Sequence, residues 1–324
     1  SPSLPSAPTA DGTSGRRTAL ARWLTDAGSP ASGLAARVLV NRIWQHLFGV
    51  GIVATSENLG LSGAPPSHPA LLEWLAADFR DHGWRLKRVI RAIMLSTVYR
   101  QDSVPLGPGT LRGSAPPAGD PQKRGPDNNL LRRQRLRRLD AEALRDAVLA
   151  MSGQLDPTPG GPPTPLVYHA ATGLVTEAEP GAAAPGRRRR SLYLQNRRIY
   201  NPTLLAVFDK PTVTSGVCRR GSSATVLQSL ALMNDTFLSG QAASSADRII
   251  SMTGESPDAR ITLAFRLALG RRPAPEEREW CRSTLEQQHA LVRSSGVSER
   301  EATRAALASL CQTLWGTNEF LYLR

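Results

Sequence analysis

The stretch Arg37-Val-Leu-Val-Asn-Arg-Ile-Trp-Gln-His-Leu-Phe48 decides how this chain folds. Its apolar residues recur at steps of three and four, which is the period of one face of an α-helix. The polar residues Asn41, Arg42, Gln45 and His46 occupy the remaining surface. We therefore predict a helix with one packing side and one polar side, and we take these four residues as candidates for ligand binding or catalysis.

The same periodicity recurs along most of the chain, so we predict a mainly α, multi-helical fold. The alternating residues at 191–195 predict a small β element. The predicted helices span residues 16–27, 36–49, 67–83, 86–99, 130–152, 203–208, 223–233, 235–251, 257–269, 275–293 and 298–315.

Proline and glycine gather between the predicted helices and suggest how the chain is divided. We expect a disordered linker at 1–14, an N-terminal helical unit at 15–101 and a Pro/Gly-rich loop at 102–128. A C-terminal helical unit follows at 129–324, with an irregular insert at 153–190. We interpret the whole as one composite domain of a longer protein, because the chain begins without Met in a linker-like run.

The net charge of +13 and the pI near 10.8 favour an anionic partner. The basic run Arg187, Arg188, Arg189 and Arg190 is the candidate surface for binding it. No RNP-like, zinc-finger or helix-turn-helix pattern accompanies this run, so we favour acidic polysaccharide or an acidic partner domain over specific nucleic acid. No segment reaches the roughly 18 apolar residues needed to span a bilayer, so we predict no transmembrane segment.

The densest group of candidate catalytic residues lies in Arg137-Arg-Leu-Asp-Ala-Glu-Ala-Leu-Arg-Asp146. Glu142 and Asp146 are four residues apart and would share one helical surface, with Arg138 and Arg145 beside them. Two carboxylates with flanking guanidinium groups can act as general acid and base, or bind a sugar or a divalent cation. The same spacing is also typical of a solvated ion-pair ladder.

His46 and His68 are the histidines in motif-like settings, and each is a candidate general base or metal ligand. Neither has the HExxH spacing of a metal site, so we predict no metal.

Cys281 and Cys311 fall on the apolar sides of successive predicted helices, either as two buried thiols or as a disulfide. The chain has no CxxCH motif, so we predict no cofactor in this chain itself.

Six ordered blocks also carry a family resemblance. They are Arg37–His46, His68–Leu75, Ser96–Arg100, Arg138–Asp146, Leu227–Asp235 and Asn318–Tyr322. Together they resemble the planctomycete-type domain of unknown function numbered 1553, the C-terminal domain of cytochrome-c-associated cell-envelope proteins. The resemblance covers residues 15–324 and departs from the family pattern at Thr225-Val226, where we expect Thr-Pro. It implies a periplasmic or cell-envelope location, with a sister domain and a haem domain upstream in the same polypeptide.

We interpret the chain as an extracytoplasmic interaction or ligand-binding module of a multidomain protein. The first alternative is an enzyme, a hydrolase or redox partner acting on polysaccharide, which requires Arg42, His46, His68, Glu142 and Asp146 in one cleft. The second alternative is non-specific binding of anionic polymers.

Overall fold

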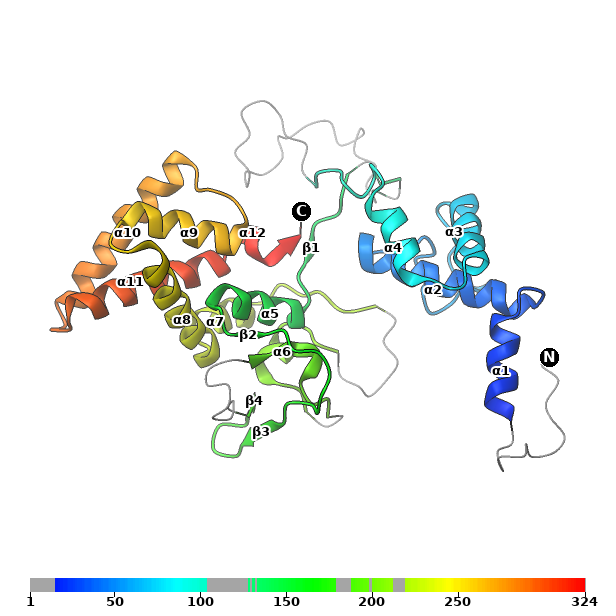
Figure 1. The fold of residues 1–324 in the computed structure, drawn as a ribbon, viewed down its shortest axis with the longest axis horizontal. Helices are drawn as coiled ribbons and strands as arrows, with labels where there is room; N and C mark the ends of the chain where they lie inside the picture. The colour runs from blue at the N-terminus through cyan, green and yellow to red at the C-terminus, as the bar shows by residue number, and fades with distance from the viewer. Residues whose placement is uncertain are drawn as a thin grey trace. The chain divides into compact units, whose positions relative to one another are not determined.

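Helices make up most of the structure, so the predicted mainly α fold is confirmed (Figure 1). The chain divides into two compact units, residues 1–137 with residue 324 and residues 138–323, and each has its own hydrophobic core. None of the described helices is both long and apolar enough to cross a bilayer. The computed structural model describes residues 15–103, 128, 130–131, 133–178, 188–197, 200–211 and 219–323.

The first unit is built around the helix that contains the opening stretch. This helix starts earlier than predicted, because the Ser29 hydroxyl accepts the Ala31 N–H and Pro30 occupies the first helical position. It ends at Phe48, and the C-cap residue Gly49 has a φ of 86°, which favours glycine. The helices of this unit are α1 (Arg16–Thr25), α2 (Pro30–Phe48), α3 (Pro69–Asp81) and α4 (Leu86–Met94).

The core of the first unit lies between α2, α3 and α4. Trp74 on α3 is exposed, whereas its neighbours Leu72 and Leu75 are buried. The buried residues are Ala36, Val40, Trp44, Phe48, Ile52, Val53, Leu72, Leu75, Ala76, Phe79, Val89, Ile93 and Leu131.

The second unit packs its long helices around α8 and α11, and Trp315 on α11 is fully buried. A capping box starts α11, because Ser298 and Glu301 each bond the other's backbone N–H. Figure 1 shows α9 and α10 beside α11, and the β3–β4 hairpin near α6. The helices are α5 (Ala141–Ser152), α6 (Thr203–Val207), α7 (Val226–Asn234), α8 (Thr236–Thr253), α9 (Pro257–Leu269), α10 (Pro275–Arg293), α11 (Glu299–Trp315) and α12 (Asn318–Leu321).

The helix predicted to start at residue 130 starts only at Ala141. Leu131 packs in the core of the first unit, and the backbone at Arg137–Arg138 is extended as β1. The helix α5 therefore cannot include these residues. Asp140 occupies the N-cap position of α5, but its side chain makes no capping hydrogen bond.

The strands are short and lie mostly in the insert of the second unit. The strand β2 (Leu155–Asp156) pairs in parallel with β5 (Arg188–Arg189), and β3 (Leu166–His169) pairs antiparallel with β4 (Leu174–Glu177). The last strand is β6 (Tyr322–Leu323).

The segment 191–195, predicted as a β element, combines two local structures. Ser191–Tyr193 forms a 3-10 turn, and Leu194 makes an isolated parallel bridge with Thr164. The turn forms because the Asp146 carboxylate accepts both the N–H and the hydroxyl of Ser191.

Cys281 on α10 and Cys311 on α11 are both buried and both free. The structure therefore contains Cys281 and Cys311 as two buried thiols, which is the first of the two predicted alternatives, and not as a disulfide.

Candidate functional site

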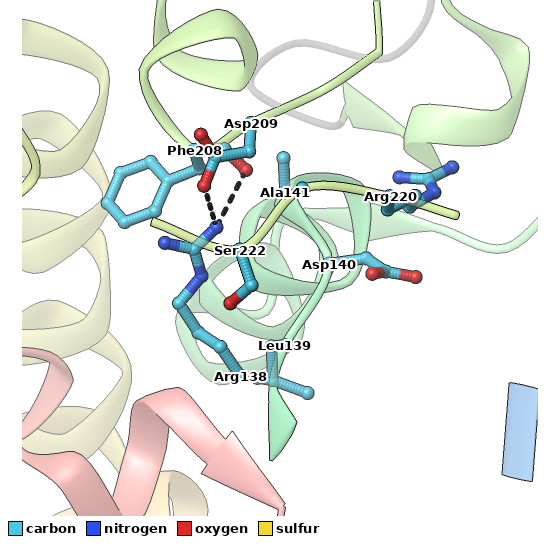
Figure 2. Close-up of a pocket in the computed structure, with 9 residues that line it drawn as sticks. Arg138, Leu139, Asp140, Ala141, Phe208, Asp209, Arg220 and Ser222 are labelled. Carbon is cyan, nitrogen blue, oxygen red and sulfur yellow. Dashed lines mark hydrogen bonds and ion pairs between the residues drawn. The ribbon is translucent and has the colours of Figure 1, made fainter. Parts of the chain in front are cut away.

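A small hollow in the second unit lies between the chain that precedes α5 and the chain that precedes α7 (Figure 2). Its volume of about 20 Å³ is enough for roughly one water molecule. The hollow is therefore too small to enclose a sugar ring. Its lining residues are Arg138, Leu139, Asp140, Ala141, Phe208, Asp209, Arg220, Gly221 and Ser222.

Arg138 is the buried cation of this hollow, with only 6% of its side chain exposed. Figure 2 shows its guanidinium group directed at the carboxylate of Asp209, which lies 2.5 Å away. The same group donates to the Gln228 side-chain oxygen at 2.9 Å and to the backbone carbonyls of Phe208 and Ser223. Arg138 therefore ties the start of α5 to the segments before and within α7.

Asp209 is held in a conformation that non-glycine residues rarely adopt, with a φ of 63°. Its carboxylate accepts the N–H and the hydroxyl of Ser223, both at 2.8 Å. Burial alone would raise the pKa of the Asp209 carboxyl, but the Ser223 donors and the Arg138 guanidinium outweigh burial and lower this pKa. Asp209 is therefore an ionised anchor for Ser223, not a free base.

Glu142, a predicted catalytic candidate, lies on the first turn of α5 and pairs with Arg220. Two contacts of 2.5 and 3.2 Å join the carboxylate to the guanidinium group. Burial raises the pKa of the Glu142 carboxyl, but the hydrogen bonds from Arg220 and from the Glu142 backbone, with the positive charges of Arg220 and Lys210, together outweigh burial, so the net change in this pKa is downward. The partner of Glu142 is therefore a cation from the loop before α7, and not Asp146.

A second polar cluster fixes the insert of the second unit against α5. The buried side chain of Arg145 donates to Glu177 and, at 3.1 Å, to the Ser191 hydroxyl. Glu177 also pairs with Arg188 at 2.9 Å, and Asp146 accepts from Ser191 at 2.7 and 2.8 Å. Asp146 and Arg145, both candidates from the sequence, therefore hold the insert in place.

Most of the described basic run belongs to this structural cluster. Arg189 lies over the Tyr193 ring at 4.0 Å and donates to the Pro162 carbonyl at 2.7 Å. Arg188 pairs with Glu177, while Arg190 is exposed and lies 3.7 Å from the Asp146 carboxylate. Arg187 is outside the described residues. Two of the four predicted anion-binding guanidinium groups are thus engaged inside the insert.

In the first unit, Asn41 is fully buried and holds the loop that follows α2. Its side-chain oxygen accepts the Val53 N–H at 2.8 Å, and its amide donates to the Val53 carbonyl at 3.0 Å and to Ser56. A side chain at Gly51 would lie 2.6 Å from the Val53 carbonyl oxygen and 2.7 Å from Asn41. Asn41 therefore holds this loop against α2, and its position leaves no room for a side chain at residue 51.

The other candidates of the first unit lie at or near its surface. Arg42 and His46 are exposed, Gln45 is half-buried, and the His46 backbone carbonyl accepts a hydrogen bond from Arg137. His68 occupies the N-cap position of α3, where its Nδ1 lies 2.9 Å from the Ser67 hydroxyl. The predicted meeting of His46 and His68 with Glu142 and Asp146 stays a prediction. Across the described ranges, no three His, Cys, Asp or Glu side chains are placed to hold a metal ion.

A group of exposed apolar side chains lies on α7. We call Val226, Leu227, Leu230 and Met233 the α7 outer face; these side chains are between 46% and 75% exposed. They lie on one side of the helix, whereas Gln228 and Leu232 are buried on the other. Contiguous apolar patches on a protein surface mark sites of interaction.

Neither Asp209 nor the α7 outer face was a candidate from the sequence. Asp209 is 71 residues from Arg138, so no local spacing links them. The helical pattern at 223–233 indicates which residues share a face, but it does not indicate whether that face is covered. The signal that points here is the block Leu227–Asp235, which contains Gln228 and carries part of the family resemblance.

These features define a mainly α protein of two units, with polar clusters that hold its segments together and an exposed apolar face on α7. Residues 16–285 match the family described as PSD1, a protein of unknown function (DUF1553). The match covers more than half of the chain, and the chain belongs to this family. Comparison with curated proteins and with solved structures found no match.

Proposed function

We propose that this protein is an interaction module that docks a partner protein domain on the α7 outer face. The observation that carries the proposal is the exposure of Val226, Leu227, Leu230 and Met233 on a helix whose opposite side is anchored by Gln228. An apolar cluster of this kind is typical of the buried centre of a protein interface.

The chemistry of the face favours a protein over an anionic polymer. No charged residue occurs between Val226 and Asn234, and the polar side chains of Ser229 and Asn234 border the apolar stripe. Polysaccharide and nucleic acid are held mainly by cations and by stacking aromatic rings, and α7 has neither.

The size of the face favours a partner in the same polypeptide. Burying four side chains of this kind contributes on the order of 6 kcal/mol, at about 1.5 kcal/mol or more each. Free association costs an estimated 4 to 15 kcal/mol, so this stripe alone gives little net affinity. A covalent linker supplies an effective concentration in the millimolar range, so even a contact with a dissociation constant near the millimolar range is populated without a high concentration of free partner.

The family resemblance supplies the expected identity of the partner. A sister domain and a cytochrome-c-like haem domain are expected upstream, in an extracytoplasmic protein of the periplasm or cell envelope. In this proposal the haem is held by the upstream domain, and this chain provides a docking surface. The enzyme alternative has less support, because Glu142 is paired with Arg220 and Asp146 with Ser191.

Methionine oxidation tests this proposal with a control inside the chain. Met233 on the outer face and Met252 on α8 are 68% and 61% exposed, so peroxide should oxidise both readily in the chain alone. In the longer polypeptide we expect Met233 to be protected and Met252 to react as before. Equal oxidation of Met233 with and without the upstream domain would contradict the proposal, as would an open reading frame that encodes no further domain.

A further inference from the structure

The positive charge of the protein is concentrated in its first unit. Residues 1–137 with residue 324 contain 19 Lys and Arg against 9 Asp and Glu, whereas residues 138–323 contain 21 against 18. The basic run at 187–190 lies in the nearly balanced second unit. An unequal distribution of charge between two parts of a chain indicates a surface for an anionic partner in the more basic part.

The segment around α4 carries much of this excess. Residues 83–101 contain five basic residues and no acidic one. Arg88 pairs with Asp78 through contacts of 2.8 and 3.0 Å. Arg85, Lys87 and Arg91 are exposed, and within the described part of the chain none of the three forms an ion pair. These three cations are therefore available to an external anion.

Exposed apolar side chains lie directly beside these cations. Leu86, Met94 and Leu95 are between 43% and 59% exposed, while Val89 and Ile93 anchor the helix in the core. Leu86, Ile90 and Met94 are spaced by four and form one row along α4. Lys87 and Arg91 form the adjacent row. We call Arg85, Leu86, Lys87, Arg91, Met94 and Leu95 the α4 face.

We propose that the α4 face binds the surface of an anionic lipid bilayer. A row of leucine and methionine beside a row of cations is typical of helices that lie at a membrane interface, where apolar groups reach the acyl boundary and cations meet the headgroups. Each such cation strengthens binding by about fivefold. A water-soluble polyanion would use Lys87 and Arg91 but leave Leu86 and Leu95 exposed, so a bilayer fits both rows. The inference does not depend on the function proposed for α7.

Vesicle sedimentation with the full chain tests this inference. We expect binding to vesicles that contain phosphatidylglycerol and little binding to vesicles of phosphatidylcholine alone. The variant Lys87→Glu/Arg91→Glu should bind anionic vesicles at least about tenfold more weakly, because two attractions become repulsions. The matched control is Arg272→Glu/Arg300→Glu, which changes the net charge equally at two exposed positions of the second unit.

The apolar row has its own test. The variant Leu86→Ser/Leu95→Ser should also lose about tenfold in vesicle binding but bind soluble poly-glutamate as well as the wild type does. Both replaced side chains are exposed, and circular dichroism checks that the helix content is retained. No binding of the wild type to anionic vesicles would overturn the proposal, as would equal losses in the charge variant and its control. Full vesicle binding by the serine variant would also overturn it, and would assign the face to a soluble polyanion or an acidic protein.

Discussion

Arg138 donates a hydrogen bond of 2.9 Å to the side-chain oxygen of Gln228, and this contact sets which side of α7 faces the solvent. The Gln228 amide in turn donates to the Val207 carbonyl at 3.0 Å. Because Gln228 is held on the inner side, Leu227 and Leu230 project outward. The polar cluster around Arg138 thus has a structural role with a functional consequence, since it presents the α7 outer face.

The carboxylate of Asp209 predicts a pH dependence of this cluster. Its pKa in the folded protein is lowered, so its contribution to stability is present above the unfolded pKa of about 3.9 and is lost as the pH falls through the lower folded value. We expect Asp209→Asn to destabilise the second unit by roughly 2 kcal/mol at neutral pH and by progressively less below about pH 4. Hydrogen exchange of α8 and α11 amides measures the difference.

The exposed pair between Asp247 and Arg304 offers a control for this experiment. Asp247→Asn should change the stability of the second unit by less than about 1 kcal/mol at neutral pH. A destabilisation by Asp209→Asn that is the same at all pH values would show that the ionised carboxylate is not what stabilises the cluster.

Asn41 should be essential to the stability of the first unit. In Asn41→Ala the buried N–H and carbonyl of Val53 lose their partner, which should cost about 3 kcal/mol. Gln45→Ala, one turn later on the same helix, should cost less than about 0.5 kcal/mol. Hydrogen exchange of the α2 amides measures both changes in stability. Equal effects of the two substitutions would contradict the stabilising role of the Asn41 side chain.

Arg271 joins the start of α10 to α12 through four hydrogen bonds. Its guanidinium group donates to Glu277 at 2.6 Å twice and to Glu319 at 2.7 and 2.8 Å. Arg271→Met leaves two facing carboxylates and should destabilise the second unit by about 2 kcal/mol. Its exposed neighbour Arg272 provides the control, because Arg272→Met should have an effect below about 0.5 kcal/mol. Similar urea midpoints for the two variants would contradict this account.

The two buried cysteines should react slowly in the folded protein. Burial raises the pKa of Cys311 to about 12, and burial together with the charge of Glu277 raises that of Cys281 to about 11. At pH 8 about one Cys281 in a thousand is then a thiolate, which is the reactive form. In a Cys218→Ser background, an aromatic disulfide reagent should label neither thiol until urea is added. Rapid labelling of the native protein would contradict their burial.

The sequence predicted the helices well because helical periodicity is local. The stretch Arg37–Phe48 and the capping serine of α11 each carry their signal within a few residues. The start of α5 was predicted too early, since nothing near Leu131 indicates that it packs in the core of the first unit. Local pattern thus predicts which element forms more reliably than where it begins.

The candidate site was predicted less completely, for a different physical reason. Arg138 was identified from its neighbours in sequence, but its partner Asp209 is distant along the chain and became adjacent only through folding. Periodicity also groups Leu227 and Met233 on one face without showing whether anything covers them. Exposure is a property of the whole fold, so the α7 outer face could not be inferred from the pattern alone.

Hydrogen exchange of the α7 amides, compared between this chain alone and the longer polypeptide that carries the proposed upstream domain, tests the central claim most directly. The variant Leu227→Ser/Met233→Ser removes half of the α7 outer face, and Met252→Ser/Leu291→Ser replaces two similarly exposed side chains elsewhere on the second unit. We predict that the docking equilibrium constant in the longer polypeptide is about 100-fold lower for the first variant, which corresponds to about 2.7 kcal/mol, and nearly unchanged for the second. Equal docking equilibrium constants of the wild type and the Leu227→Ser/Met233→Ser variant would contradict the claim.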